Sequence, residues 1–239
     1  MCGITGGIGP SAPQQQLLDA QLKSIEHRGP DDSGTYLNNG IGLGMCRLAI
    51  VEIAAGKQPA SDAVEQIHIV WNGEIYNYRD LRTELEGRGV HCRDSSESEV
   101  VINLYLEFGL DFINKLNGMF AIAIHDSRDN SLHLIRDRMG KKPLWISQLN
   151  DGTLFFASEV RALMLARPDR TLRTEMIAEV MQYGYINSPN SAFNEIHQVP
   201  PASLTSWRDG KTTTATYWTT DFDSKIDISY QDALEVTKE

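Results

Sequence analysis

A cysteine is the second residue of the chain, directly after Met1 and before Gly3. Removal of Met1 would leave Cys2 with a thiol and a free α-amine. Their reference pKa values, about 8.5 and about 8, are close enough for the amine to take the thiol proton and return it to a leaving group. Cys2 is therefore a candidate N-terminal nucleophile with its own base. The alternative is a small residue without function at a frayed chain end.

Asn72, Gly73 and Glu74 directly follow an apolar run at 67–71, IHIVW. Asn-Gly is a strong turn signal, so one interpretation is a strand that stops at residue 71 and a tight turn. The other is a loop that carries function and leads into a helix. In that case the Asn72 amide and the Gly73 backbone N–H supply the two donors of an oxyanion hole, and Glu74 places an anion beside them.

Two further charged residues suit a ligand with charges of both signs. Arg47 follows Cys46 on an expected strand, so the two side chains point to opposite faces. Arg47 is either an exposed edge cation or a carboxylate clamp, for which its planar fork is suited. Glu97 begins an expected helix, where a carboxylate also favours the helix dipole. Together with Glu74 it could form an anionic pocket for an ammonium group.

These residues together describe one ligand. A nucleophile with its own base attacks an acyl carbon, and two N–H donors receive the oxyanion. An arginine holds a carboxylate and two acids hold an ammonium. A free α-amino acid with a side-chain amide has all of these groups, and glutamine is such a molecule.

Composition and motifs exclude several classes of function. The net charge of -10 disfavours nucleic acid and anionic membranes as partners. Three cysteines at unpaired spacings, with no signal peptide or long apolar segment, indicate the cytoplasm. The six histidines show no metal-ligand spacing, so we expect no metal and no cofactor in this chain. Neither a phosphate-binding P-loop nor a complete dinucleotide-binding glycine pattern is present.

Hydrophobic periodicity and turn residues predict the elements that position these side chains. We expect Asn77, Ser96 with Glu99, and Ser158 to cap helices. The segment 199–218 is rich in turn residues, and residues 227–239 begin an amphipathic helix. Without regular β–α–β alternation, the pattern indicates an α+β fold. The expected helices are 14–26, 78–86, 97–108, 159–166 and about 173–183, and the expected strands are 40–51, 67–71, 119–125, 131–136 and 153–157.

Eight motifs, in order over about residues 2–218, resemble class II glutamine amidotransferase domains, specifically the asparagine synthetase branch. The motifs are MCGI at the start, HRGPDDSG at 27–34, RLAIVE at 47–52, WNGEIYNY at 71–78, SESEV at 96–100, GMFAIAIHD at 118–126, RDRMGKKPLW at 136–145 and FASEVRAL at 156–163.

The resemblance implies the N-terminal-nucleophile hydrolase fold, a four-layer αββα sandwich with two antiparallel sheets. It implies Cys2 as nucleophile with its α-amine as base, and Asn72 and Gly73 as the oxyanion hole. It further implies substrate-binding roles, which comprise Arg47 for the carboxylate, Glu74 and Glu97 for the amine, and backbone groups around Ile50 and Val51 for the pocket wall. Residues 219–239 would then be a linker and the start of a helix that leads to a second domain.

Two departures from the family change the expectation. Glu97 stands where the family usually has aspartate, and we predict weaker glutamine binding from the displaced charge. The sequence also lacks the SGGxDS pyrophosphate loop of the synthetase domain. ATP and Mg²⁺ are therefore expected only for that C-terminal domain, the implied partner that would receive ammonia and amidate aspartate.

Several alternatives stay open. The parent enzyme could amidate another carboxylate, such as a sugar or an antibiotic precursor. The chain could also be a non-catalytic docking domain, although the presence of all the expected site residues argues against loss of activity. The third alternative is a hydrolase that acts on a different amide. Competition by free glutamine would distinguish it from a glutaminase. A homodimer is also left open.

Overall fold

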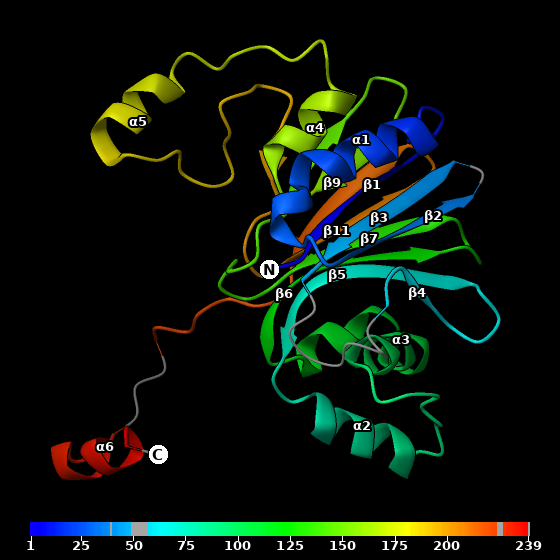
Figure 1. The fold of residues 1–239 in the computed structure, drawn as a ribbon. Helices are drawn as coiled ribbons and strands as arrows, with labels where there is room; N and C mark the ends of the chain where they lie inside the picture. Colours follow the sequence, from blue (N-terminus) through cyan, green and yellow to red (C-terminus); the bar gives the residue numbers. More distant parts are fainter. Residues whose placement is uncertain (39, 49–56, 224–226, 239) are drawn as a thin grey trace.

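The computed structural model describes residues 1–38, 40–48, 57–223 and 227–238. Two six-stranded sheets lie face to face, with helices on their outer faces (Figure 1). Sheet A runs in the order β10 (His197–Gln198), β8 (Trp145–Gln148), β9 (Leu154–Ala157), β1 (Gly3–Ile8), β3 (Ile41–Arg47) and β2 (Asp32–Asn38). Sheet B runs in the order β12 (Lys211–Thr216), β11 (Ser203–Arg208), β7 (Ser131–Arg136), β6 (Gly118–Asp126), β5 (Ile67–Ile75) and β4 (Ala60–Ser61).

Every strand pairing within the two sheets is antiparallel. Helices α1 (Gln15–Ile25) and α4 (Val160–Ala166) cover sheet A, and α2 (Tyr78–Gly87) and α3 (Glu97–Phe108) lie beyond sheet B (Figure 1). Short 3₁₀ helices follow α1 at Glu26–Arg28 and α3 at Gly109–Lys115. The expected α+β class and αββα layering are confirmed.

Strand β6 shows why the sequence folds into layers. Phe120, Ile122 and Ile124 pack into the core beneath α3. Ala121 and Ala123 point the other way, into the core between the two sheets. Because both faces of the strand are buried, its sequence is a continuous apolar run and not an alternation of apolar and polar residues.

The expected end of β5 at residue 71 is wrong. The strand continues to Ile75 and pairs with β6 along its whole length, including Asn72 with Ala121 and Gly73 with Phe120. Pairing with a buried neighbouring strand overrides the local turn preference of Asn-Gly. The catalytic candidates therefore lie on a strand, near its end, and not in a hairpin turn.

One of three expected helix caps is confirmed. The Ser96 hydroxyl accepts a hydrogen bond from Glu99 N at 3.2 Å, at the start of α3. Asn77 precedes α2 but does not cap it, because its side chain binds the backbone of Lys115 and Asn117. Ser158 does not cap α4, since its hydroxyl accepts from Ile4 N in the neighbouring strand.

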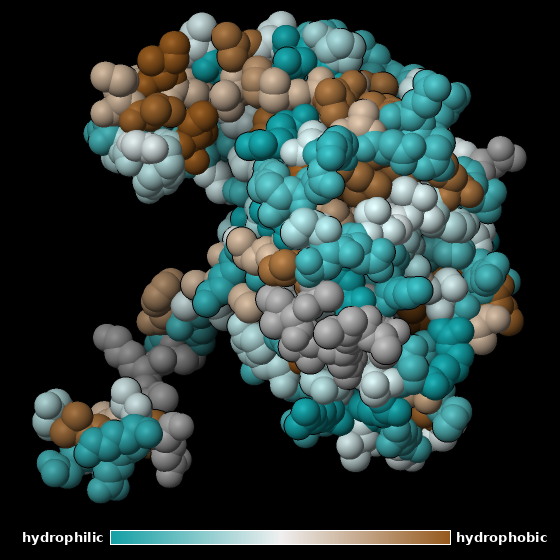
Figure 2. Space-filling model, in the orientation of Figure 1, coloured by the Kyte–Doolittle hydropathy of each residue, from teal (hydrophilic) through white to brown (hydrophobic). Residues whose placement is uncertain are grey.

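The C-terminal part contains more regular structure than the turn-rich sequence indicates. Strands β11 and β12 form a hairpin whose turn is Asp209-Gly210, inside the segment expected to be mainly turns. Helix α5 (Met176–Tyr183) projects from the sandwich, and α6 (Tyr230–Val236) lies apart from it (Figure 1). Apolar side chains gather on α5 (Figure 2), where Met181 is 83% exposed.

Candidate active site

A cavity of about 300 Å³ lies where β1, β3 and β5 meet the first turn of α3. Its wall brings together five residues that the sequence analysis singled out, namely Cys2, Arg47, Gly73, Glu74 and Glu97. Asn72 lies buried on the strand beside Gly73. Ile50 and Val51, also expected in this pocket, lie outside the described residues.

Cys2 is half-buried and precedes β1, the strand at the centre of sheet A. Gly3 pairs with Cys46 of β3, which fixes the chain on one side of residue 2. Arg28 fixes it further, because its Nε donates to the Cys2 carbonyl at 3.0 Å while Nη1 forms an ion pair with Glu159 at 3.1 Å. The chain end is thereby held in place and does not fray.

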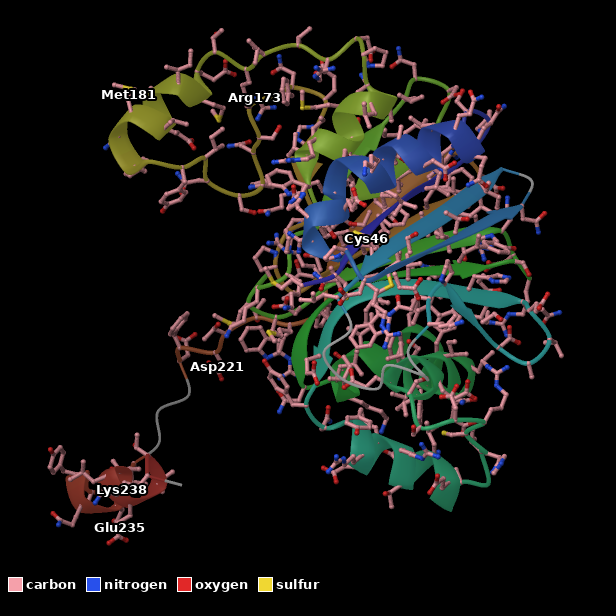
Figure 3. The ribbon with its side chains drawn as sticks, viewed as in Figure 1. Cys46, Arg173, Met181, Asp221, Glu235 and Lys238 are labelled. Atoms are coloured by element: carbon pink, nitrogen blue, oxygen red, sulfur yellow. The ribbon has the colours of Figure 1, made fainter. Side chains whose placement is uncertain are left out.

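Cys46 belongs to a different environment, as expected from strand alternation. It lies on sheet A below α1 (Figure 3), and its thiol donates to Ile25 O at 3.2 Å. Burial raises the pKa of the Cys46 thiol. Cys2 is the cysteine in the cavity wall, and Cys46 packs in the core beneath the helix.

Asn72 leaves a buried hydrogen-bond donor without a partner. The residue is 3% exposed, and its Nδ2 meets no acceptor in the described part of the chain. An unpaired buried polar group costs about 1–3 kcal/mol and needs a specific explanation, of which a catalytic role is one. An oxyanion would provide the missing acceptor.

Gly73 has a steric reason to be glycine. A Cβ atom there would lie 2.2 Å from the backbone oxygen of Met119 and 2.7 Å from the Cα of Phe120. Any side chain would push β5 away from β6 and displace Asn72 with it. Close packing of the two strands therefore requires glycine at position 73. The absence of a side chain also leaves the Gly73 backbone open toward the cavity.

Charged groups of both signs share the cavity wall. Arg47 is 7% exposed at the end of β3, and Asp31 N donates to its carbonyl at 3.0 Å. Glu97 occupies the first position of α3, and its Oε2 accepts from Ile75 N at 3.2 Å. Glu74 lies on β5 between them in sequence. An arginine and two carboxylates in one cavity match the two opposite charges of a zwitterionic amino acid.

The residues that form the other walls of the cavity were not predicted from the sequence. Trp71 donates from its indole Nε1 to the Ser98 hydroxyl at 2.9 Å, and its backbone N–H donates to Gln58 Oε1 at 2.7 Å. Tyr78 and Arg79 of α2 also line the cavity. The signal available for finding Trp71, Tyr78, Arg79 and Ser98 was their position near Asn72 or Glu97 in the sequence. Gln58 carries no such signal, because only folding brings it next to Trp71.

Ion pairing stabilises the start of α3 just below the cavity. Arg93 binds the buried carboxylate of Glu99, with Nη2 at 2.7 Å from Oε2. Burial disfavours the charged form of Glu99, but hydrogen bonds from Arg93 and Asn103 outweigh it and lower the pKa of the carboxyl. Glu99 is thus a structural anion, distinct from Glu97 in the cavity.

A family model described as a glutamine amidotransferase domain matches residues 1–218. The chain belongs to this family. As an amidotransferase domain, it is 35% identical over 228 residues to "Asparagine synthetase [glutamine-hydrolyzing] 1" of Bacillus subtilis (strain 168), an alignment that covers 93% of this chain and 36% of that protein. It is 38% identical over 167 residues to the Arabidopsis thaliana protein of the same description, over 68% of this chain and 28% of the relative.

The amidotransferase domain spans about a third of the length of these curated relatives, 36% of the Bacillus protein and 28% of the Arabidopsis protein. Solved structures share its fold. The "structure of the allosteric regulatory enzyme of purine biosynthesis" aligns with a TM-score of 0.67 at 20% identity, over 92% of this chain and 50% of that one. The glutamine phosphoribosylpyrophosphate amidotransferase from B. subtilis aligns with a TM-score of 0.66 at 18% identity, with the same coverage. The expected N-terminal-nucleophile hydrolase fold is confirmed.

The described residues contain neither a cluster of metal-ligating side chains nor a membrane-spanning helix. No group of three or more His, Cys, Asp or Glu side chains in that part of the chain is arranged to hold a metal ion. None of its helices combines the length and the apolar character needed to cross a bilayer. The expected lack of a metal and the expected cytoplasmic location stay predictions.

Proposed function

We propose that this domain hydrolyses glutamine to glutamate and ammonia, with Cys2 as the nucleophile. One observation carries the proposal. A half-buried thiol and charges of both signs line a single cavity, and the Asn72 amide, a buried donor without a partner among the described residues, lies on β5 next to the cavity residue Gly73. This set of groups fits an amino acid whose side chain ends in an amide, and the family match supports the same chemistry.

The reaction requires removal of Met1. The α-amine of Cys2 then takes the thiol proton, and the sulfur attacks the side-chain carbonyl carbon of glutamine. The Asn72 amide and the Gly73 backbone N–H stabilise the oxyanion. As the carbon–nitrogen bond breaks, the amine returns its proton to the departing NH₂ group, and ammonia leaves. Water then cleaves the thioester, which yields glutamate and restores the thiol.

Charge complementarity orients the substrate for this attack. In this proposal the Arg47 guanidinium binds the α-carboxylate in a bidentate manner, which a lysine could not reproduce. Glu74 and Glu97 bind the α-ammonium. Because both ends of the amino acid are held, the amide is delivered to Cys2 in one orientation, which lowers the entropic cost of the attack. Backbone groups of Ile50 and Val51 complete the proposed pocket.

The curated relatives support a wider role. They are described as glutamine-hydrolysing asparagine synthetases and are nearly three times as long as the region they share with this chain. We propose that ammonia from Cys2 passes to a C-terminal synthetase domain that uses ATP and Mg²⁺ to amidate aspartate. An acceptor other than aspartate is the alternative, and an assay of the longer protein with several carboxylates would separate the two.

A direct assay tests the glutaminase proposal. Protein without Met1, verified by intact mass, is incubated with glutamine, and glutamate and ammonia are measured together. We expect equimolar release, loss of activity in Cys2→Ala, and full activity in Cys92→Ala, which removes a buried cysteine away from the cavity. Equal activity in Cys2→Ala and the unmodified sequence would contradict the proposal.

A further inference from the structure

A buried lysine lies beside the chain end that the proposed reaction uses. Lys142 is 7% exposed, and its Nζ lies 3.7 Å from Met1 Sδ. Among the described residues this sulfur is the only polar partner of the ammonium, and no carboxylate forms an ion pair with it. Buried ammonium groups are normally paired, because removal of an unpaired charge from water is costly. The proposed removal of Met1 would take away even this weak partner.

The backbone of Lys142 is fixed in this position by buried groups. The Asp137 carboxylate accepts hydrogen bonds from Lys142 N and Lys141 N, each at 2.9 Å. The Arg136 guanidinium donates to Lys142 O at 2.8 Å and to Gly140 O at 2.6 Å. Arg136 and Asp137 are themselves 4% and 1% exposed. The loop thus holds the backbone of Lys142 beside the chain terminus, and the side chain places its ammonium within reach of that terminus.

We propose that Lys142 acts through the α-amine of Cys2, and that its ammonium makes this amine a weaker proton acceptor once Met1 is removed. This inference rests on the proposed function. Five covalent bonds separate Met1 Sδ from Cys2 N, so Lys142 Nζ lies within about 10 Å of that nitrogen. At this distance and an effective dielectric constant near 20, a like charge lowers the pKa of the amine by about one unit.

Other charged groups near Cys2 leave this effect in place. Arg28, which contacts the Cys2 carbonyl, is paired with Glu159. The cavity wall contains two cations, Arg47 and Arg79, and two carboxylates, Glu74 and Glu97. Positive and negative side chains are therefore balanced in number around Cys2 on these sides. Lys142 adds a positive charge without a carboxylate partner among the described residues.

The consequence is a larger fraction of free base at neutral pH. An α-amine with a pKa of about 8 is roughly one-tenth deprotonated at pH 7, and with a pKa of about 7 it is half deprotonated. Lys142 therefore raises the active fraction about fivefold at pH 7 and has little effect above pH 9.

The test is the pH dependence of kcat/KM for glutamine in Met1-free protein. For Lys142→Met we expect the acidic limb to move up by about one pH unit, with about fivefold lower kcat/KM at pH 7 and near-equal values above pH 9. Lys142→Arg should restore the original limb. Lys141→Met is the matched control, because it removes an exposed neighbouring lysine and should leave the profile unchanged.

A second measurement separates this inference from the proposed function. The rate at which iodoacetamide alkylates Cys2, followed by intact mass across the same pH range, needs no turnover of glutamine. We expect the same upward shift in Lys142→Met, and Lys142→Gln serves if the methionine variant does not fold. An unshifted alkylation profile in a folded variant would overturn the role of Lys142. A shifted profile in a protein that never hydrolyses glutamine would support it and contradict the proposed function instead.

Discussion

The Asn72 amide and the Gly73 backbone N–H are the two donors of the proposed oxyanion hole. Their types and spacing predict this role, and in the structure Gly73 lines the cavity while Asn72, its buried neighbour on β5, has no partner for Nδ2 among the described residues. The alternative interpretation, a turn at Asn72-Gly73, rested on the local preference of these two residues alone. It failed because both residues pair with β6, which is distant in sequence. Gln58 could not be found in this way, because its contact with Trp71 depends on a fold that the local sequence does not encode.

Replacement of Asn72 by alanine tests the oxyanion hole. Loss of one donor should lower kcat by about 10²–10³-fold with little change in KM, because the donor acts mainly in the transition state. Since Nδ2 has no partner among the described residues, the substitution breaks no hydrogen bond of that atom, and the variant should stay folded. Steady-state kinetics and a melting curve check both points. A large rise in KM at constant kcat would instead place Asn72 in ground-state binding.

Glu97→Asp tests the consequence of the longer acid at this position. We predict a few-fold lower KM for glutamine, because aspartate returns the charge to the position usual in the family. In the structure, Glu97 Oε2 is held by Ile75 N, and this contact could be lost in the shorter side chain. Kinetics on the unmodified sequence and on Glu97→Gln give the reference values. An unchanged or higher KM in Glu97→Asp would contradict this prediction.

At the scale of elements, the long apolar segments and most of their ends were predictable, whereas the end of β5 and two of the three side-chain caps were not. The buried strands β6, β7 and β9 and the helices around the sandwich follow from periodicity. The caps failed where tertiary contacts compete, since Ser158 binds Ile4 N and Asn77 binds the 115–117 backbone. Ser96 succeeded because its partner, Glu99 N, lies within the same helix turn.

Ser96→Ala tests the link between the α3 cap and the site. Loss of the cap should cost about 1 kcal/mol, or about 2–4 °C in Tm for a domain of this size, and should raise KM because Glu97 follows directly. Ser229→Ala is a matched control, since Ser229 caps α6 with the same geometry but α6 buries no residue. Equal effects of the two substitutions would refute this account of α3.

At the scale of the whole molecule, a cluster of buried imidazoles sets the response to acid. His125 is 2% exposed, both of its ring nitrogens lack partners among the described residues, and burial lowers its pKa to about 4. His68 stacks on Tyr36 from the opposite sheet with ring centroids 3.7 Å apart. His68 lies 6.2 Å from His125 between ring centroids, and burial also lowers the pKa of His68. His133, whose pKa burial lowers as well, lies outside this cluster, against Tyr105 on the other face of sheet B. Protonation of this cluster therefore opposes sheet packing.

Above pH 6.5, the pKa of histidine in the unfolded chain, these neutral imidazoles do not reduce the free energy of unfolding. As the pH falls from 6.5 toward 4, protonation of the unfolded chain lowers the free energy of unfolding. For His125 alone the loss approaches about 3 kcal/mol. His125→Phe should weaken the pH dependence of the urea midpoint between pH 7.5 and 4.5, because a phenyl ring fills the same space and cannot be protonated. A variant whose midpoint falls as steeply as that of the unmodified sequence would contradict the assignment.

Cys2 forms and releases the covalent intermediate in the proposed reaction, so labelling of this residue tests the central claim, a glutamine-specific Cys2 nucleophile, most directly. Met1-free protein is incubated with a diazo-ketone analogue of glutamine, and the intact mass is recorded with and without excess glutamine. We predict a single adduct on Cys2 whose formation glutamine suppresses, and no adduct in Cys2→Ala. A folded, Met1-free protein that forms no adduct, or an adduct that glutamine does not suppress, would contradict the account.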